Sequence, residues 1–400
     1  MTCKIILSVN TAWNIANFRT GLIRAFLSKG YEVLAVAPSD EHVHRITTLG
    51  ARFIPMEMDN KGTNPFRDFG LFLRFCRLFF REKPCIFLGY TIKPNIYGGL
   101  AAAFCGIPAI NNVAGLGTVF IRETWLTWFV SKLYRRSFKK AKKVFFQNND
   151  DLLLFLQRGL VPQAVTDRLP GSGVNTEFFT PVFTHEDSAQ SSSCSSYTAA
   201  RCGKNVPFRF LLVARLLWDK GVGEFVEAAK HIRALMGNVE FQLLGFLDVA
   251  NRTAVHRNIL DLWIKSGIIQ YLGEAVDVRP AIAQADCIVL PSYREGIPRT
   301  LLEASSMAKP IITTDTVGCR DVVINGVTGF LCKLRDSEDL ADKMMMMLNL
   351  APEERKNMGL KGRAFMLREF DEQIVINRYL KAIKDIIESD SLMPAKIHHH

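Results

Sequence analysis

The first half of the chain alternates short apolar runs with segments of helical spacing. A helical segment, Leu22–Leu27, follows the first run and ends near Gly30. Alternation of buried strands with helices predicts a doubly wound α/β domain with a parallel sheet, in which ligands bind at the carboxyl ends of the strands. The runs that read as buried strands are Ile5–Val9, Tyr31–Ala37, Cys85–Gly89, Ile107–Asn112 and Val144–Gln147.

The second half repeats the same alternation, and a different composition separates the two halves. Residues 184–205 are rich in Ser, Ala and Gln and lack periodicity, which is typical of a flexible linker or a surface insertion. A chain of 400 residues exceeds what one core usually supports. We therefore expect an N-terminal domain over 1–183, a second over 206–370, and a helix and tail over 371–400 that cross back to the first. The strands expected in the second domain are Phe208–Val213, Glu240–Leu244, Ile268–Leu272, Asp286–Leu290 and Ile311–Thr313.

One stretch of the second half combines a strand, a loop and a helix with two carboxylates. Cys287–Leu290 reads as a buried strand, and Pro298 stands where a first helical residue is expected. Glu295 lies on the loop and Glu303 inside the helix. A helix N-terminus after a parallel strand favours phosphate, and the two carboxylates can accept hydrogen bonds from sugar and ribose hydroxyls. Two solvated carboxylates at a helix start would give the same spacing.

The letters from Glu295 to Ala304, EGIPRTLLEA, resemble the E-x7-E signature of retaining family-4 glycosyltransferases. The resemblance implies that Glu303 holds the nucleotide ribose and that Glu295 lies beside the donor sugar. It also implies the GT-B fold, in which two Rossmann-like doubly wound domains face a cleft, the donor in the second and the acceptor in the first. The donor-binding residues expected on this basis are Glu303, Gly296, Ile297, Arg299, Thr300, Leu301, Leu272 and Gly273.

Two cations follow the first strand of the second domain. Arg215 comes at the strand end and Lys220 just before the next helix, and R-L-x-x-x-K-G is similar to the diphosphate-binding pair of the family. A leaving diphosphate needs such a pair to neutralise its growing charge. With no Asp-x-Asp pair in a suitable loop, we expect neither a metal ion nor a cofactor. Arg215, Lys220 and Glu295 are the predicted catalytic residues, although two ordinary surface cations would give the same letters.

The acceptor is expected at loops of the first domain. The loop after the first strand, which we place at Asn10–Arg19, has no G-x-G-x-x-G turn, and this argues against a nicotinamide or flavin site. YTIKPNIYGG and AGLG are similar to a bacterial branch of family 4 that extends polyprenyl-diphosphate-linked sugars in capsule and O-antigen synthesis. Where some relatives have a histidine base, this chain has Asn111 and Asn112. The acceptor-binding candidates are Asn17, Arg19, Tyr90, Lys93, Gly115 and Gly117.

The charge balance indicates an anionic partner. The formal net charge is +11 and the sequence pI near 9.2, yet no nucleic-acid-binding motif is present. Trp125–Lys143 carries seven cations and no acid, which favours a helix on an anionic membrane over a solvated face. Phe66–Lys83 interleaves arginines with Phe and Leu; we expect a helix packed on the sheet, with a membrane-surface helix as the alternative.

The expected location is the cytoplasm, peripheral on the cytoplasmic face of the inner membrane. No apolar run reaches the length of a spanning helix, and the first residues lack a secretory signal. Nine cysteines without a CxxC pair, an odd number, argue against a disulfide framework and for a reducing compartment.

The resemblance, together with these features, implies a retaining glycosyltransferase, a hexosyltransferase, that moves a hexose or N-acetylhexosamine from a nucleotide sugar to a polyprenyl-diphosphate-linked sugar. We expect the nucleotide to be uridine diphosphate. The alternatives are a nucleotide-sugar epimerase of the same fold and a non-catalytic nucleotide-sugar-binding protein. A dinucleotide oxidoreductase fits the strand pattern but lacks the glycine turn.

Overall fold

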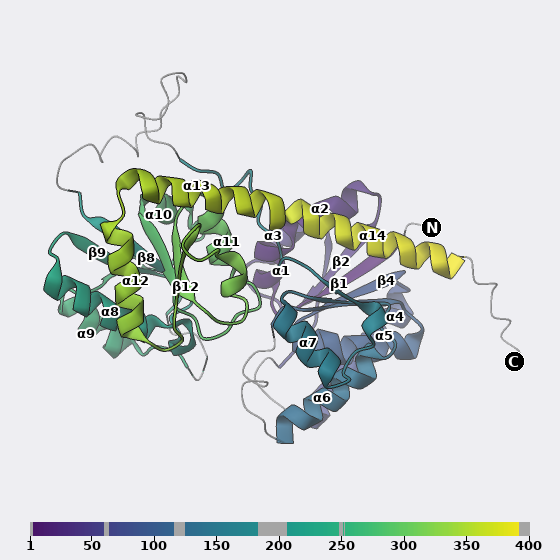
Figure 1. Cartoon of the computed structure of the whole chain (residues 1–400). Helices are drawn as coiled ribbons and strands as arrows, with labels where there is room; N and C mark the ends of the chain where they lie inside the picture. Colours follow the sequence, from purple (N-terminus) through teal and green to yellow (C-terminus); the bar gives the residue numbers. More distant parts are fainter. Residues whose placement is uncertain are drawn as a thin grey trace, which may run out of the picture. The chain divides into compact units, whose positions relative to one another are not determined.

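The computed structural model of the chain describes residues 3–59, 64–115, 125–182, 206–247, 251 and 253–391. These residues form two compact units (Figure 1). The first is Met1–Gly173 with Glu372–His400, and the second is Val174–Asp371. The first unit therefore ends before the expected boundary at 183, because Val174 and Phe179 pack in the core of the second unit. The predicted linker, 184–205, lies outside the described residues.

The first unit is built on a parallel sheet of seven strands in the order β3-β2-β1-β4-β5-β6-β7. Its strands are buried along most of their length, except at the two edges. β1 pairs with both β2 and β4, and the order in which successive strands are added to the sheet reverses between β1 and β4. The strands are β1 (Lys4–Ser8), β2 (Glu32–Ala37), β3 (Arg52–Pro55), β4 (Ile86–Tyr90), β5 (Ala109–Val113), β6 (Lys143–Phe146) and β7 (Thr166–Arg168).

Helices cover both faces of this sheet (Figure 1). One face carries α1 (Ala12–Phe18), α2 (Thr20–Ser28), α3 (Val43–Thr48) and the C-terminal α14 (Glu372–Ser391). The other face carries α4 (Pro65–Glu82), a π-helical turn η1 (Pro94–Gly98), α5 (Gly99–Cys105), α6 (Trp125–Phe138) and α7 (Asn149–Gln157).

The second unit has a parallel sheet of six strands in the order β10-β9-β8-β11-β12-β13. One face is covered by α8 (Val222–Leu235), α9 (Arg257–Lys265) and α12 (Ser337–Asn349), the other by α10 (Arg279–Gln284), α11 (Arg299–Ser306) and most of α13 (Pro352–Glu369). Two doubly wound α/β units are thus present, as predicted. The strands are β8 (Phe208–Val213), β9 (Val239–Leu244), β10 (Gln270–Tyr271), β11 (Cys287–Leu290), β12 (Ile311–Thr314) and β13 (Gly329–Cys332).

Two local predictions were wrong. The segment expected as a loop after β1 contains α1, because Thr11 caps it: its hydroxyl accepts a hydrogen bond from the Asn14 N–H at 3.1 Å. The basic segment expected as one helix to Lys143 stops being helical at Phe138. Lys143 already begins β6, so the last cations of the segment lie on the connection into a strand.

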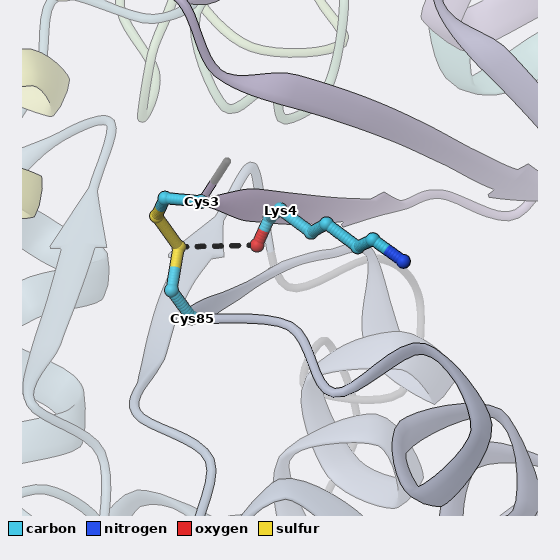
Figure 2. The surroundings of a disulfide bond; sticks show 3 residues. All are labelled: Cys3, Lys4 and Cys85. Carbon is cyan, nitrogen blue, oxygen red and sulfur yellow. Dashed lines mark hydrogen bonds between the residues drawn. A yellow bond between two sulfur atoms is a disulfide. The ribbon is translucent and has the colours of Figure 1, made fainter. Parts of the chain in front are cut away.

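The absence of disulfides was also predicted wrongly. Cys3 and Cys85 form a disulfide, with their Cα atoms 5.7 Å apart (Figure 2). Each residue immediately precedes a strand, and those strands, β1 and β4, are parallel neighbours. An odd number of cysteines does not show which of them the sheet brings together. The inference of a reducing compartment, which rested on that number, therefore loses its basis. In the part of the chain that the structure describes, no helix has the length and apolar character needed to cross a bilayer.

Candidate functional site

The strand order of the second unit reverses between β8 and β11, and most of the predicted donor residues follow these two strands. In open parallel sheets, ligands bind outside the carboxyl ends of the strands at such a reversal. Arg215 and Lys220 follow β8, and the loop from Pro291 to Pro298 follows β11. The topology therefore brings together two segments that lie far apart in the sequence.

Lys220 and Glu295 meet across this reversal as an ion pair in which both side chains are mostly buried. The hydroxyl of Ser292, itself fully buried, lies 2.7 Å from the same Glu295 oxygen and 3.1 Å from the Asp219 carbonyl oxygen. The Tyr293 N–H also donates to the Asp219 carbonyl, at 2.9 Å. The two loops are thus joined by side chains and by backbone, which fixes the amine of Lys220 against the carboxylate of Glu295.

Close backbone approach is what allows these loops to meet. Gly221 has a φ of +73°, and a methyl group on it would lie 2.7 Å from the Pro291 carbonyl carbon and closer still to its oxygen. Only glycine fits such a position. The glycine of the R-L-x-x-x-K-G pattern therefore has a structural reason to follow Lys220.

The loop that carries Glu295 is supported from β12 and the turn after it. The Thr314 hydroxyl donates to the Ser292 carbonyl, and the Thr316 hydroxyl donates to the Tyr293 carbonyl at 3.0 Å. The Glu295 N–H donates to the Val317 carbonyl at 3.1 Å. Gly318 packs directly on the Glu295–Gly296 backbone. Sequence reasoning missed this support because it comes from the next strand of the sheet, β12, and the turn after it.

Arg215 is exposed, and across the described residues no ion pair or hydrogen bond holds its side chain. The two predicted cations thus differ: Lys220 is held by a carboxylate, whereas the Arg215 guanidinium has no carboxylate partner in the described part of the chain. An exposed cation at a strand end leaves its five donors available for an anionic ligand.

Glu303 lies one helical turn after Arg299, whose Nε donates to its carboxylate at 2.9 Å. Burial raises the pKa of Glu303, and the neighbouring Arg299 opposes that rise. Pro298, expected as the first helical residue, is instead the N-cap of α11, and the helix begins at Arg299. Gly296, Ile297 and Thr300 are partly exposed around this helix start.

Leu301 does not fit its predicted role. Its side chain is fully buried in the core and its N–H donates to the Pro298 carbonyl at 3.0 Å, so neither group is available to a donor. Leu272 and Gly273 extend the edge next to β9: the Leu272 N–H donates to Leu243 at 2.8 Å, and the Gly273 carbonyl accepts from Gly245 at 2.9 Å. The Leu272 side chain is 36 % exposed, so it can contact a ligand from this edge.

The first unit has its own reversal, between β1 and β4, and the predicted acceptor residues Arg19 and Tyr90 meet there. The Arg19 guanidinium lies 4.3 Å from the centre of the Tyr90 ring, where the cation and the ring attract each other. Arg19 is only 6 % exposed, and among the described residues no carboxylate pairs with it. Within the described residues, the one hydrogen bond of its side chain is from Nη1 to the Phe18 carbonyl, at 3.1 Å.

Asn17 and Lys93, also predicted to bind the acceptor, are engaged inside the unit. The Asn17 amide donates to Trp13 at 2.9 Å and accepts from Arg45 at 3.1 Å. The Lys93 amine pairs with the buried carboxylate of Asp68 on α4. Gly115 is partly exposed just after β5, and Gly117 lies outside the described residues.

Asn111 and Asn112 are buried, and their amides hold neighbouring groups. Asn111 donates to Asn95 Oδ1 at 3.0 Å, and Asn112 donates to the Tyr379 hydroxyl at 2.9 Å. Tyr379 comes from α14, so the C-terminal helix supplies a residue to the end of β5. The long sequence separation hid this contact from the motif analysis.

Two doubly wound units, each with cations at its strand reversal, are typical of proteins that bind phosphorylated or nucleotide-linked ligands. The comparison with protein families narrows that class. Residues 4–148 match the model described as glycosyl transferase 4-like, and residues 207–349 match glycosyl transferases group 1. The chain belongs to this glycosyltransferase family and is a hexosyltransferase.

Curated relatives match along most of the chain. The chain is 28 % identical over 386 residues to the N,N'-diacetylbacillosaminyl-diphospho-undecaprenol alpha-1,3-N-acetylgalactosaminyltransferase of Campylobacter jejuni, covering 94 % of this chain and 97 % of the relative. It is 24 % identical to the UDP-Gal:alpha-D-GlcNAc-diphosphoundecaprenol alpha-1,3-galactosyltransferase of Escherichia coli, and the match covers 78 % of this chain and 81 % of the relative.

Solved structures agree on the fold. A glycosyltransferase from Rickettsia africae superposes with a TM-score of 0.75 at 19 % identity, covering 97 % of this chain and 99 % of that one. Anabaena HepE in complex with UDP superposes with a TM-score of 0.75 at 15 % identity, and the match covers 98 % of this chain and 100 % of that one. The fold is GT-B, as the resemblance implied.

Proposed function

We propose that this enzyme transfers a hexose or N-acetylhexosamine from a nucleotide sugar, with uridine as the base, to a polyprenyl-diphosphate-linked sugar in bacterial surface glycan assembly. The observation that carries the proposal is the buried Lys220–Glu295 pair at the β8–β11 reversal. Support for the acceptor comes from the two relatives named above, both of which act on undecaprenol-diphosphate-linked sugars. UDP bound to a structural neighbour supports the uridine donor.

The chemistry follows from where charge develops. The bond between the anomeric carbon and the diphosphate oxygen breaks, and negative charge grows on the diphosphate. Arg215, Lys220 and the first amides of α11 neutralise that charge, so the leaving group departs without a metal ion. The acceptor hydroxyl attacks the same face of the sugar and gives its proton to the departing phosphate oxygen. The anomeric configuration is thereby retained.

The roles of the two glutamates differ because their surroundings differ. Glu295 is held by Lys220 and by the Ser292 hydroxyl, so its position is fixed for hydrogen bonds to the donor sugar. Glu303 lies inside α11 with Arg299 as its partner, and in our proposal its carboxylate accepts hydrogen bonds from the ribose hydroxyls. On the acceptor side we assign Arg19, Tyr90 and Lys93, at the β1–β4 reversal of the first unit, to the acceptor diphosphate.

A lipid-linked acceptor requires the enzyme to work at a membrane surface. We propose a peripheral location on the cytoplasmic face of the inner membrane, with the basic segment Trp125–Lys143 facing anionic lipid. Lys132, Arg136, Lys139 and Lys140 are exposed along it. Arg135, in contrast, donates to the carbonyls of Arg158 and Gly159 at 2.8 and 2.9 Å and so caps α7. Basic residues near an anionic leaflet contribute about 1 kcal/mol each, a contribution that salt weakens.

A transfer assay tests the proposed function. The protein is incubated with UDP- and GDP-sugars and a polyprenyl-diphosphate-linked sugar, with and without EDTA. We expect transfer from a UDP-sugar, unaffected by EDTA, and kcat about 10²–10³-fold lower in Glu295→Gln and in Lys220→Gln. The matched controls are Glu227→Gln and Lys230→Gln, which alter an exposed ion pair of the same composition on α8.

Each outcome bears on one part of the proposal. Wild-type transfer by both site variants would refute the assignment of the pair. Conversion of the UDP-sugar to an isomer without an acceptor would identify an epimerase, and binding without turnover would identify a non-catalytic protein. An inverted linkage in the product, read by NMR, would refute retention.

A further inference from the structure

Helix α4 has apolar side chains on two opposite faces. Its inner face packs on the sheet through buried side chains, as the sequence predicted. Its outer face carries Phe66, Phe69, Leu73 and Phe80, which are 88, 60, 49 and 61 % exposed. The spacing i, i+3, i+7 and i+14 places them on one stripe of the helix, which runs about 21 Å at 1.5 Å per residue. The inner residues are Leu71, Phe75, Leu78 and Phe79.

The apolar stripe continues onto the neighbouring helix. Phe72 stacks near Phe69, with ring centres 6.1 Å apart, and also lies 6.1 Å from the ring of Phe104 on α5. Phe104 is 71 % exposed. The inner face already anchors α4 to the sheet, so the outer aromatic residues are not needed for the core. Large exposed apolar patches of this kind mark sites of protein or membrane contact.

The charges on the same outer face all have one sign. Arg67, Arg74, Arg77 and Arg81 are exposed, whereas the two acids of the helix, Asp68 and Glu82, are buried. Arg67 lies 3.7 Å from Asp59, and Arg81 lies 3.0 Å from Glu82. For Arg74 and Arg77 no carboxylate lies within ion-pair distance in the described ranges. An apolar stripe beside exposed arginines matches a bilayer that presents acyl chains beneath anionic headgroups.

The stripe begins beside a residue that the acceptor loop uses. Asp68, between Phe66 and Phe69 in the chain, pairs with Lys93 and accepts a hydrogen bond from the Tyr97 hydroxyl at 2.9 Å. Lys93 follows β4, at the reversal of the first sheet. A membrane lying on Phe66 and Phe69 would therefore be within one helical turn of the residue that holds Lys93.

We propose that the outer face of α4, with Phe104 of α5, is the surface by which this enzyme docks on an anionic lipid bilayer. The inference rests on the proposed function in one respect, since it explains how a lipid-linked acceptor diphosphate reaches Lys93 without leaving the membrane. The arginines attract the headgroups, and the phenylalanines enter the boundary between headgroups and acyl chains. The basic segment after Trp125 adds charge but is not the inserting element.

Vesicle binding tests the surface directly. The full-length protein is sedimented with phosphatidylglycerol-containing vesicles at low and high salt. We expect Phe66→Ser with Phe69→Ser to lower the partition coefficient about 100-fold, about tenfold for each lost phenylalanine. The double variant Arg74→Gln with Arg77→Gln should lower the partition coefficient about fivefold for each lost charge at low salt, and should have little effect at high salt. The matched control is Leu262→Ser with Leu367→Ser, two exposed leucines on helices of the second unit.

A fluorescence measurement reports insertion separately from affinity. Quenching by lipids brominated on the acyl chain should be greater in Phe69→Trp than in the wild type, whose own five tryptophans set the background, and Leu262→Trp should show no such increase. Wild-type vesicle binding by the double phenylalanine variant, or no increase in quenching at position 69, would overturn the proposal. So would equally tight binding to pure phosphatidylcholine. A dimer in sedimentation equilibrium that the phenylalanine substitutions dissociate would show that the face is covered by a second copy instead.

Activity measurements separate this inference from the proposed function. The phenylalanine variants should transfer sugar at the wild-type rate to a water-soluble, short-chain diphosphate-linked acceptor. They should lose transfer to a polyprenyl-linked acceptor embedded in vesicles. If the wild type transfers to neither acceptor, the proposed function fails, while the vesicle measurements still decide whether the face docks. Equal loss on both acceptors would show a structural defect and overturn the docking role.

Discussion

Gly318 offers a test of whether the position of Glu295 matters, without changing any charged residue. It lies in the turn after β12 and has a φ of +80°. A methyl group added there would lie 2.5 Å from the Glu295 carbonyl oxygen and closer still to that of Gly296. Gly318→Ala therefore presses on the backbone of the loop that carries the proposed catalytic carboxylate.

The size of the effect follows from this distance. Close carbon–oxygen contacts in proteins settle at about 3.3–3.6 Å, so the loop must move by about 1 Å. A misplacement of about 1 Å at a catalytic group can lower the rate about 10²-fold. The left-handed backbone itself costs alanine about 1–2 kcal/mol, whatever its surroundings. Gly318→Ala should thus reduce kcat strongly and stability moderately.

Gly326→Ala separates the two effects. Gly326 has a φ of +74°, and no atom lies within 4 Å of an added methyl group. This control carries the same backbone cost but exerts no pressure on Glu295. We expect thermal melts to shift downward in both variants, and transfer to fall about 10²-fold only in Gly318→Ala.

Wild-type kcat in a folded Gly318→Ala protein would refute the reasoning, because the proposed catalysis depends on Glu295 being held against Lys220. An equal loss in the Gly326→Ala control would also refute it, since the effect would then come from backbone strain alone. A crystal structure of the Gly318 variant with Glu295 unmoved would attribute any loss to some other cause.

Two further predictions concern stability and pH. The disulfide joins two cysteines that are 82 residues apart in the sequence. The double variant Cys3→Ser with Cys85→Ser should therefore have an unfolding free energy about 2–4 kcal/mol lower than that of the wild type, measured by urea melts. An unchanged urea midpoint when reductant is added to the wild type would contradict this prediction. Because the folded pKa of Glu303 is raised above its ordinary value of 4.5, the folded state binds its proton more tightly, and the stability from this group is lost as pH rises through the folded pKa. Glu303→Gln should flatten that part of the pH–stability curve, and UDP affinity of the wild type, read by calorimetry, should rise with pH over the same window as the carboxylate ionises.

The interior strands of both sheets could be predicted from the sequence, whereas three of the four edge strands could not. Central strands are buried on both faces and read as continuous apolar runs. β3 and β7 lie at the two edges of the first sheet and are largely half-buried or exposed, so their letters carry little apolar signal. β13, also an edge strand, follows a loop and has only four residues. All three were absent from the predicted strands, whereas β10, the fourth edge strand, lies within the predicted Ile268–Leu272.

The site divides in a similar way. Charged residues such as Lys220, Glu295 and Glu303 stand out in the sequence because their spacing matches a motif. The groups that position them do not. The Ser292 hydroxyl contacts the Glu295 carboxylate and the Asp219 carbonyl, and Thr314 and Gly318 contact the backbone of the loop after β11 from β12 and the turn that follows it. Such contacts depend on strand order, which the sequence of this chain does not show. The disulfide was missed for the same reason, since its two cysteines meet only because β1 and β4 are neighbours.

Both lysines that we assign to phosphates are already paired with a carboxylate of their own unit. Lys220 is held by Glu295 and Lys93 by Asp68, and in each pair both side chains are mostly buried. A lysine has a flexible stem with four carbons, so an unpaired amine would sample many positions and would lose that freedom on binding phosphate. The carboxylate removes most of this cost before the ligand arrives and leaves the remaining amine protons for phosphate oxygens. Substituting the carboxylate should therefore weaken the binding of phosphate-bearing substrates even where the carboxylate itself never touches them, and for Lys93 the carboxylate in question is on α4, the helix proposed to meet the membrane.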